Sequence, residues 1–275
     1  MKTLLPFYCI LLSALFVVQA QAKTQTSPAT SISTPTSVSV ATSVNDDQVI
    51  QLTYSSAVRL DQVLNDGLNN IKTLPSQRVH TSPQPVFWTG AALYDQKQTK
   101  QMQQQKQQLL SRLDRLAQEW QDDAEQVSTV NALKGSLTKL MLAHRIMQPL
   151  DPDLVRMQPS LSPLLSGDFQ LILPARPTSV LVLGAVRRSK NILWQERANA
   201  AFYLDQAKPT SDAENSDVWV IQPDGVAEQH QIAYWNHKHQ DIAPGAIIYM
   251  GFDSLPSDFT TLNQDIINLL RNRAL

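Results

Sequence analysis

Three histidines near the C-terminal end come closest to the spacing of a metal site. His237 and His239 are two positions apart, so on a strand both imidazoles would point the same way, and His230 lies on the adjoining segment. Three imidazoles can hold zinc. Trp235-Asn236, however, is typical of a strand end or a loop, and Lys238 separates the two later histidines. We interpret all three as solvent-exposed and predict no metal site.

Ser136-Leu137-Thr138-Lys139 has the Ser-x-x-Lys spacing of serine enzymes that form acyl intermediates. The other motifs of those enzymes, Ser-Asp-Asn and Lys-Thr-Gly, do not follow it. Ser136 and Lys139 also fall on the polar face of a predicted helix. The sequence therefore favours a chance match.

Paired carboxylates could carry out glycoside chemistry, and two pairs stand out, Asp122 with Asp123 and Asp151 with Asp153. The second pair flanks Pro152, which indicates the start of a short helix that is capped by an aspartate. The first pair lies at a polar break between two predicted helices. None of the 8 glycines has the spacing of a phosphate-binding loop. We predict no catalytic residues and no cofactor.

Arg145 and Arg156 are our candidate binding residues. They flank the point where a predicted helical insertion rejoins the surrounding module, and such junctions form clefts. The planar donor fork of arginine suits carboxylates and sugar hydroxyls. The alternative is an ordinary surface or interdomain ion pair.

The N-terminal segment indicates export through a cleaved signal peptide over residues 1–22. Lys2 precedes an apolar run from Leu4 to Val18, and Ala20-Gln21-Ala22 provides the cleavage site. Cys9, the only cysteine, lies inside the run and follows Pro6-Phe7-Tyr8 instead of the small residues of a lipoprotein signal, so we predict no lipidation. We expect a periplasmic mature chain that starts at Lys23 and lacks a transmembrane span, since no later stretch is apolar enough. A net charge of −1 argues against nucleic-acid binding.

Composition and periodicity predict an α+β fold in several parts. Residues 23–46, rich in Ser and Thr, are expected to be a flexible spacer. A first module over 47–175 begins with a strand at 48–54, followed by a helix that Ser56 caps and Gly67 ends. Residues 91–145 are predicted to form an inserted helical hairpin, because two apolar stripes lie on either side of a polar break.

A second module over 176–253 repeats the order of the first. Its strands include 218–222 and 227–234, joined by Pro223-Asp224-Gly225, a strong hairpin turn. In each module a helix with a similar Ala-x-x-Leu-Asp-Gln sequence is followed by a glycine, Gly167 or Gly245, that opens a strand. The inserted hairpin accounts for most of the difference in length.

A final amphipathic helix is expected at 257–273, with Ser257 as its cap. Its apolar stripe has two interpretations: it packs on its own chain, or it docks to a partner or a membrane surface. We favour packing on the same chain, because an exposed stripe of that size promotes aggregation.

Three stretches resemble the capsule biosynthesis GfcC family: residues 151–156 (Asp-Pro-Asp-Leu-Val-Arg), residues 233–236 (Ala-Tyr-Trp-Asn) and residues 244–249. Residues 177–251 are also similar to the soluble-ligand-binding β-grasp modules of outer-membrane polysaccharide exporters. The resemblance implies two β-grasp domains, a helical hairpin in the first and a C-terminal amphipathic helix. It offers no catalytic residues to carry over, and the Ser/Thr-rich segment departs from it.

The sequence therefore predicts a non-catalytic accessory protein of capsule or exopolysaccharide secretion, whose partner is the polysaccharide, an outer-membrane exporter or both. The first alternative is a periplasmic carbohydrate-active enzyme with an unrecognised site, and the second is a structural adaptor that binds no sugar. Two carboxylates at glycosidase separation in a cleft would favour the enzyme. An open cleft lined by aromatic residues and Arg145 would favour the binding module.

Overall fold

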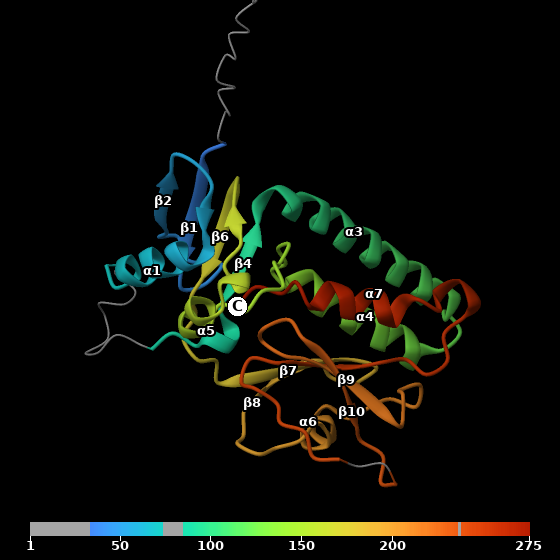
Figure 1. The fold of residues 1–275 in the computed structure, drawn as a ribbon. Coiled ribbons are helices and arrows are strands. Elements are labelled where there is room, and N and C mark those ends of the chain that lie inside the picture. The colour runs from blue at the N-terminus through green and yellow to red at the C-terminus, as the bar shows by residue number, and fades with distance from the viewer. Residues whose placement is uncertain (1–33, 74–84, 236–237) are drawn as a thin grey trace, which may run out of the picture. The chain divides into compact units, whose positions relative to one another are not determined.

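The computed structural model describes residues 34–73, 85–235 and 238–275. These residues form two principal mixed sheets with helices packed against them (Figure 1), which confirms the α+β class. The predicted signal peptide lies outside the described residues. All described residues belong to one compact unit.

The first sheet has the strand order β2-β1-β6-β4. Its central strand β1 runs antiparallel to β2 and parallel to β6, and β4 is antiparallel to β6. Helix α1 packs on this sheet, and a two-stranded ladder of β3 and β5 lies beside the helix. The elements are β1 (Thr36–Ala41), β2 (Ile50–Tyr54), β3 (Val58–Arg59), α1 (Leu60–Ile71), β4 (Ala92–Asp95), α5 (Pro152–Met157), β5 (Leu164–Leu165) and β6 (Asp168–Ile172), with 3-10 turns at Trp88–Gly90 and Pro159–Leu161.

The second sheet has the order β10-β9-β11-β7-β8. Strand β7 is antiparallel to β8 and parallel to β11, which is antiparallel to β9. The hairpin between β9 and β10 turns at Asp224-Gly225, as predicted. The elements are β7 (Ser179–Gly184), β8 (Lys190–Leu193), α6 (Ala200–Ala207), β9 (Asp217–Ile221), β10 (Ala227–Gln231) and β11 (Ile247–Met250).

The two sheets repeat one topology, as the predicted internal repeat implies. In each, an antiparallel hairpin is followed by a helix, and the last strand lies parallel to the first strand of the hairpin. Gly167 and Gly245 precede the equivalent last strands β6 and β11 with φ of 116° and 91°. These conformations strongly favour glycine, which explains why both positions marked the repeat in the sequence.

The prediction of a flexible spacer over 23–46 is wrong at its C-terminal end. Residues 36–41 form β1, which lies between β2 and β6, and Val38 and Val40 are fully buried. Alternating Ser and Val suits a strand with one buried face, but its low complexity hid the pattern. The folded part of the chain therefore begins before Asp47.

The predicted boundaries of the first helix are also wrong. Val58 belongs to β3, Arg59 occupies the N-cap position of α1 without a side-chain cap, and the helix continues past Gly67 to Ile71. A Cβ on Gly67 would lie 3.1 Å from Leu171 Cδ2 of β6. Gly67 therefore allows the helix to approach the sheet closely; it does not end the helix.

The inserted hairpin is confirmed as two helices, α3 (Gln96–Glu119) and α4 (Ala124–Lys139), whose N-termini are capped by Asp95 and Asp123. The start of the predicted hairpin is instead β4. Lys106 of α3 is buried and donates hydrogen bonds to the carbonyls of Thr138 and Leu140, at 2.9 and 2.8 Å, which ties α3 to the end of α4. The apolar stripes belong to the same core cluster as the second sheet, although the hairpin is inserted between two strands of the first.

The C-terminal helix is shorter than the predicted 257–273. A 3-10 turn at Ser257–Phe259 precedes α7 (Leu262–Leu270), and Ser257 lies within the turn and does not cap the helix. Beyond α7 the backbone pairs with the segment after α4, since Ala143 donates to the Asn272 carbonyl at 3.1 Å and Leu142 forms an isolated bridge with Arg273. This pairing replaces the last helical turn that the sequence predicts.

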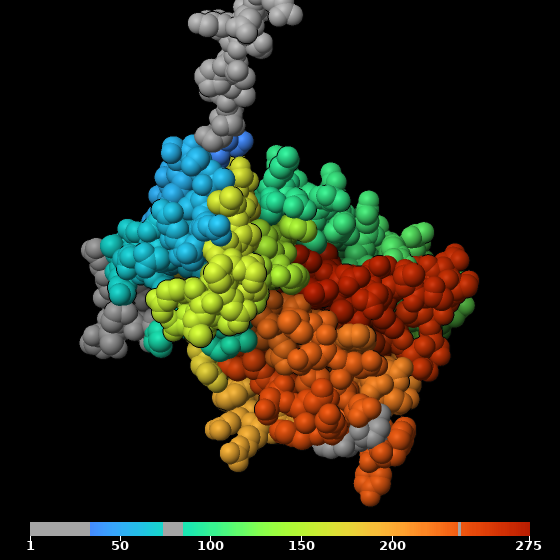
Figure 2. Space-filling model, viewed as in Figure 1, coloured from blue at the N-terminus to red at the C-terminus, as the bar shows by residue number. Residues whose placement is uncertain are grey.

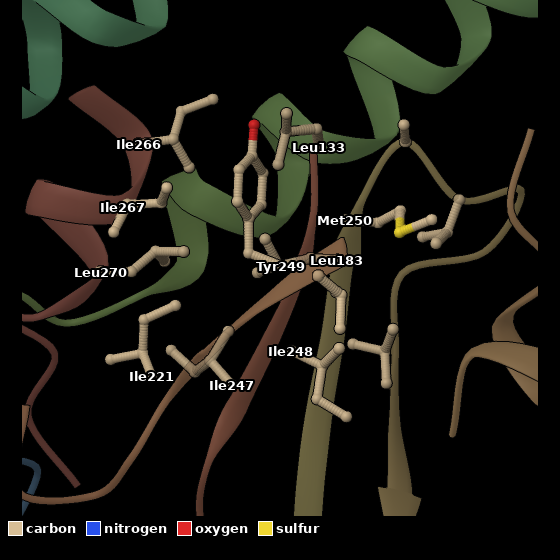
Figure 3. Close-up of a cluster of buried hydrophobic side chains, with 14 of the residues drawn as sticks. Leu133, Leu183, Ile221, Ile247, Ile248, Tyr249, Met250, Ile266, Ile267 and Leu270 are labelled. Carbon is tan, nitrogen blue, oxygen red and sulfur yellow. The ribbon is translucent and has the colours of Figure 1, made fainter. Parts of the chain in front are cut away.

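The apolar stripe of α7 is buried on its own chain. Leu262, Ile266 and Leu270 are fully buried, and Figure 3 shows Ile266, Ile267 and Leu270 facing the cluster around Tyr249. In the space-filling view α7 is a red band that lies between the green atoms of the hairpin helices and the orange atoms of the C-terminal half (Figure 2), and α7 contacts β9. Arg112 of α3 also pairs with Asp265 of α7. No helix in the described part of the chain is both long and apolar enough to span a membrane.

Candidate functional site

Two adjoining hollows share Thr89 and Asp224 in their linings. The first, which we call the Arg145 hollow, has a volume of about 350 Å³ and is lined by the 3-10 turn at Trp88–Gly90, by residues 147–151 and by the β9–β10 turn. The second, which we call the Arg176 hollow, has a volume of about 860 Å³. Both volumes fall within or near the range of small-molecule sites.

The backbone around Arg145 is fixed by pairing with two distant segments. Ile146 donates to the Leu93 carbonyl of β4 at 2.8 Å, and the Arg145 amide donates to the Asn272 side-chain oxygen at 3.0 Å. The segment that follows α4 therefore extends the first sheet beyond β4 and also meets the residues that follow α7. This is the junction that the sequence indicated.

The Arg145 guanidinium is almost fully buried, with 6% of the residue exposed. Its Nη2 donates to the Ala91 carbonyl at 2.9 Å. Burial lowers the pKa of Arg145, while Tyr94 and Asp224 act in the opposite direction. Burial likewise raises the pKa of Tyr94 to about 12, and its hydroxyl donates to the Arg273 carbonyl. Arg145 thus places a positive charge at the edge of the hollow, and the Asp224 carboxylate in the same lining stabilises that charge.

The turn between β9 and β10 forms one wall of the Arg145 hollow. Gly225 has φ of 87°, and a Cβ there would lie 2.9 Å from the Arg271 carbonyl oxygen and 3.2 Å from Arg145 Cδ. Arg271 Nε in turn donates to the Gly225 carbonyl at 2.9 Å. The turn is therefore held against the aliphatic part of Arg145 by the residue that follows α7.

Arg156 lies elsewhere. Its side chain is 76% exposed, forms an ion pair with Asp153 at 2.5 Å, and is not part of the lining of the Arg145 hollow. Of the two candidate arginines, only Arg145 therefore lies beside a hollow at the junction. For Arg156 the structure shows an exposed surface ion pair, which is the alternative that the sequence left open.

Sequence reasoning missed the central feature of the Arg176 hollow. The Arg176 guanidinium carbon lies 5.6 Å from the ring centroid of Phe87 and 5.1 Å from that of Trp194. Trp194 is itself fixed, because its indole N–H donates to the Ile242 carbonyl at 2.8 Å. These side chains come from three separate segments, and nothing in their local sequence indicates that they meet.

Carboxylates line the rest of the Arg176 hollow. Gln222 donates to Glu228 Oε2 at 2.9 Å and accepts from the Ala243 amide at 3.2 Å, so both ends of its amide are used. The buried His230 lies behind Glu228, with Nε2 3.2 Å from the same carboxylate oxygen. Gln222 and His230 therefore orient Glu228 at the wall of the hollow.

The remaining chemical candidates have structural roles or stay untested. Asp151 and Asp123 cap α5 and α4, as predicted for Asp151. Ser136 donates to the Ala132 carbonyl within α4. His230 is buried, contrary to our prediction of an exposed loop residue, and His237 lies outside the described residues. No group of three metal-binding side chains is found among the residues that the structure describes.

The sequence of this chain matches two models of a known protein family. Residues 35–176 match the model described as capsule biosynthesis GfcC, N-terminal, and residues 188–274 match that of the GfcC C-terminal region. The chain belongs to the capsule biosynthesis GfcC family. It is also 32% identical over 221 residues to the uncharacterized protein YjbG of Escherichia coli (strain K12). The aligned region covers 77% of this chain and 89% of that protein. The family match starts at residue 35, which agrees with β1 as the first strand of the GfcC-type fold.

The boundary between the two GfcC regions falls beside the candidate site. Residues 177–187 lie between the two matched ranges and contain all of β7, while Arg176 is the last residue of the N-terminal match. The Arg176 hollow therefore combines Phe87 and Arg176 from the N-terminal region with Trp194 and Glu228 from the C-terminal region. Both GfcC regions are needed to complete it.

Proposed function

We propose that this protein is a periplasmic accessory component of capsule or exopolysaccharide secretion, which binds the polysaccharide or its exporter without catalysing a reaction. Membership of the GfcC family supports the role in capsule biosynthesis. The observation that carries the binding role is the pair of adjoining hollows, which places Arg145, aromatic rings and carboxylates along one stretch of surface. Planar polar side chains and aromatic rings are suited to binding sugars, because they offer hydrogen bonds and an apolar surface together.

Export is part of the proposal, and it is supported by the N-terminal sequence. We expect the chain to be cleaved after Ala22, so that mass spectrometry of the periplasmic fraction finds Lys23 as the first residue. A variant with Leu11 and Leu12 replaced by arginine should remain uncleaved in the cytoplasm, because its apolar run is interrupted. Recovery of the full-length chain from the cytoplasm of the wild-type strain would contradict the proposal.

The main alternative is a carbohydrate-active enzyme, whose active site would lie among the carboxylates of the Arg176 hollow. Glu228 and Asp241 are the residues to test, since a glycosidase needs two carboxylates. Incubation of the protein with the purified polysaccharide should release no new reducing ends. If the wild-type protein releases reducing ends and the Glu228→Gln variant does not, the protein is a hydrolase and the non-catalytic role is wrong.

Replacing Arg145 with alanine is expected to reduce surface polysaccharide by about tenfold or more, if the arginine contributes at least about 1.4 kcal/mol to binding. The variant also loses the hydrogen bond to Ala91, so we expect the free energy of unfolding to fall by about 1–3 kcal/mol. Polysaccharide output is measured in a deletion strain complemented by each variant, and stability by thermal unfolding.

Arg156→Ala is the matched control, because Arg156 is exposed and has only a surface ion pair. Such pairs contribute about 0–1 kcal/mol, so this variant should retain both output and stability. The proposed role of Arg145 is wrong if Arg145→Ala is folded at the growth temperature and supports normal output.

A further inference from the structure

We propose that the Arg176 hollow recognises an uncharged stretch of polysaccharide and discriminates against polymers of uronic acid. The inference rests on the proposed binding function and adds to it the class of ligand. It follows from two features of the hollow: a donor that lies beside two aromatic rings, and an excess of carboxylate acceptors.

Arg176 lies beside two aromatic rings, and its hydrogen-bond donors are available to a ligand. The rings of Phe87 and Trp194 both lie within 6 Å of its guanidinium carbon, a distance at which cation–π attraction is effective. Among the described residues, none accepts a hydrogen bond from Arg176, whose side chain lies in an exposed position. A guanidinium whose N–H groups are not used by the protein can donate to two neighbouring sugar oxygens.

Whereas Arg176 offers hydrogen-bond donors to a ligand, the carboxylates of the hollow offer acceptors. Four of them, Glu196, Asp224, Glu228 and Asp241, line the hollow together with two arginines, Arg176 and Arg197, which gives a net charge of −2 when His239 is neutral. In the described part of the chain, neither Glu196 nor Asp224 forms an ion pair with a lysine or arginine. Asp224 accepts from the Val226 amide and Glu228 from Gln222, and a ligand with hydrogen-bond donors can use the acceptor positions that these carboxylates leave open.

Sugar hydroxyls satisfy both requirements, because each can donate to a carboxylate and accept from a guanidinium. A hexuronate also carries hydroxyls, but it brings its own negative charge toward the acidic wall, where like charges repel. Trp194 and Phe87 add apolar surface for the C–H groups of a sugar ring. The lining therefore fits neutral hexoses and N-acetylhexosamines better than uronic acids.

The test uses the processed protein purified from the periplasm and an array of oligosaccharides of equal length. The array contains neutral hexose, N-acetylhexosamine and hexuronate chains, and affinities of the retained sugars are measured by calorimetry. We expect uncharged chains to bind at least about tenfold more tightly than hexuronates. Raising the salt concentration should narrow the difference by improving hexuronate binding alone, because salt screens the repulsion.

Arg176→Gln is expected to weaken binding of the uncharged sugar by about tenfold or more, whereas Arg188→Gln should have no effect. Arg188 is the matched control, since it is an exposed arginine that does not line the hollow. Asp241→Asn should reduce the discrimination against hexuronates. The proposal is overturned if hexuronates bind best, if no sugar is retained, or if Arg176→Gln binds like the wild-type protein.

Failure of this proposal is distinguishable from failure of the proposed function. If deletion of the gene abolishes surface polysaccharide but Arg176→Gln restores it fully, the Arg176 hollow is not the sugar site and the accessory role stands. If deletion leaves surface polysaccharide unchanged, the accessory role itself is wrong, whatever the array shows.

Discussion

A chain that ends at Pro256 is expected to lose its cooperative fold. The deletion removes six large buried apolar side chains, those of Phe259, Leu262, Ile266, Ile267, Leu269 and Leu270, together with the small Ala274. At about 1.5–3 kcal/mol for each of the six, the lost burial amounts to roughly 9–18 kcal/mol before the entropy of ordering the segment is subtracted. That is comparable with the whole stability of a typical protein, about 5–15 kcal/mol.

The loss is larger than these side chains alone suggest, because the helix also covers the second sheet. Tyr249 is fully buried, and its hydroxyl donates to Asn263 at 2.7 Å. Burial strongly raises the pKa of Tyr249, which shows how fully the phenol is shielded from water. Deletion of the segment removes Asn263, so the phenol would lose its hydrogen-bond acceptor as well as this shielding. The truncated chain therefore exposes an apolar surface that promotes aggregation.

Thermal unfolding followed by circular dichroism is the measurement, and Gln264→Ala is the control. Gln264 is on the exposed face of α7, so its replacement should change the free energy of unfolding by less than about 0.5 kcal/mol. A truncated protein that melts like the parent but no longer supports polysaccharide output would assign the helix to a partner instead of to its own core.

Periodicity predicted the elements whose apolar residues recur regularly. The two hairpin helices, the β9–β10 turn and the stripe of the last helix all follow from local spacing, and Gly167 with Gly245 marked the repeat. The prediction failed at β1, whose Ser-Val alternation looks like low-complexity sequence and becomes recognisable only when β2 and β6 flank it. It failed again at Gly67, where packing against Leu171 outweighs the helix-ending tendency of glycine.

The candidate site was predictable only where it depends on the order of elements. Arg145 stood out because it follows an insertion, and the end of an insertion must rejoin the sheet that it left. The cluster of Phe87, Arg176 and Trp194 depends on contacts between residues 18 and 89 positions apart in sequence, and each of them alone is an ordinary residue in a connecting segment or at a strand end. Sequence periodicity carries no information about such contacts.

Gly184→Ala is expected to lower the free energy of unfolding by about 2–6 kcal/mol. Gly184 ends β7 with φ of 110°, a conformation that costs a non-glycine residue about 1–3 kcal/mol. A Cβ there would also lie 2.0 Å from the Met250 carbonyl oxygen of β11. That oxygen accepts a hydrogen bond from the Ala185 amide at 2.8 Å, so it cannot move away without breaking the contact between β7 and β11. Overpacking of this kind adds about 1–3 kcal/mol.

Gly167→Ala separates the two contributions. Gly167 has a nearly identical φ of 116°, but a Cβ there would meet nothing within 4 Å. This variant should therefore show only the conformational cost, about 1–3 kcal/mol, and melt at a higher temperature than Gly184→Ala. Equal destabilisation by the two variants, measured by urea unfolding, would show that β11 does not approach β7 as closely as the structure indicates. A larger cost at Gly184 instead identifies the β7–β11 pair as the rigid frame that supports the C-terminal half of the site. The segment that carries Trp194 follows β8, which pairs with β7. The turn that carries Asp224 follows β9, which pairs with β11.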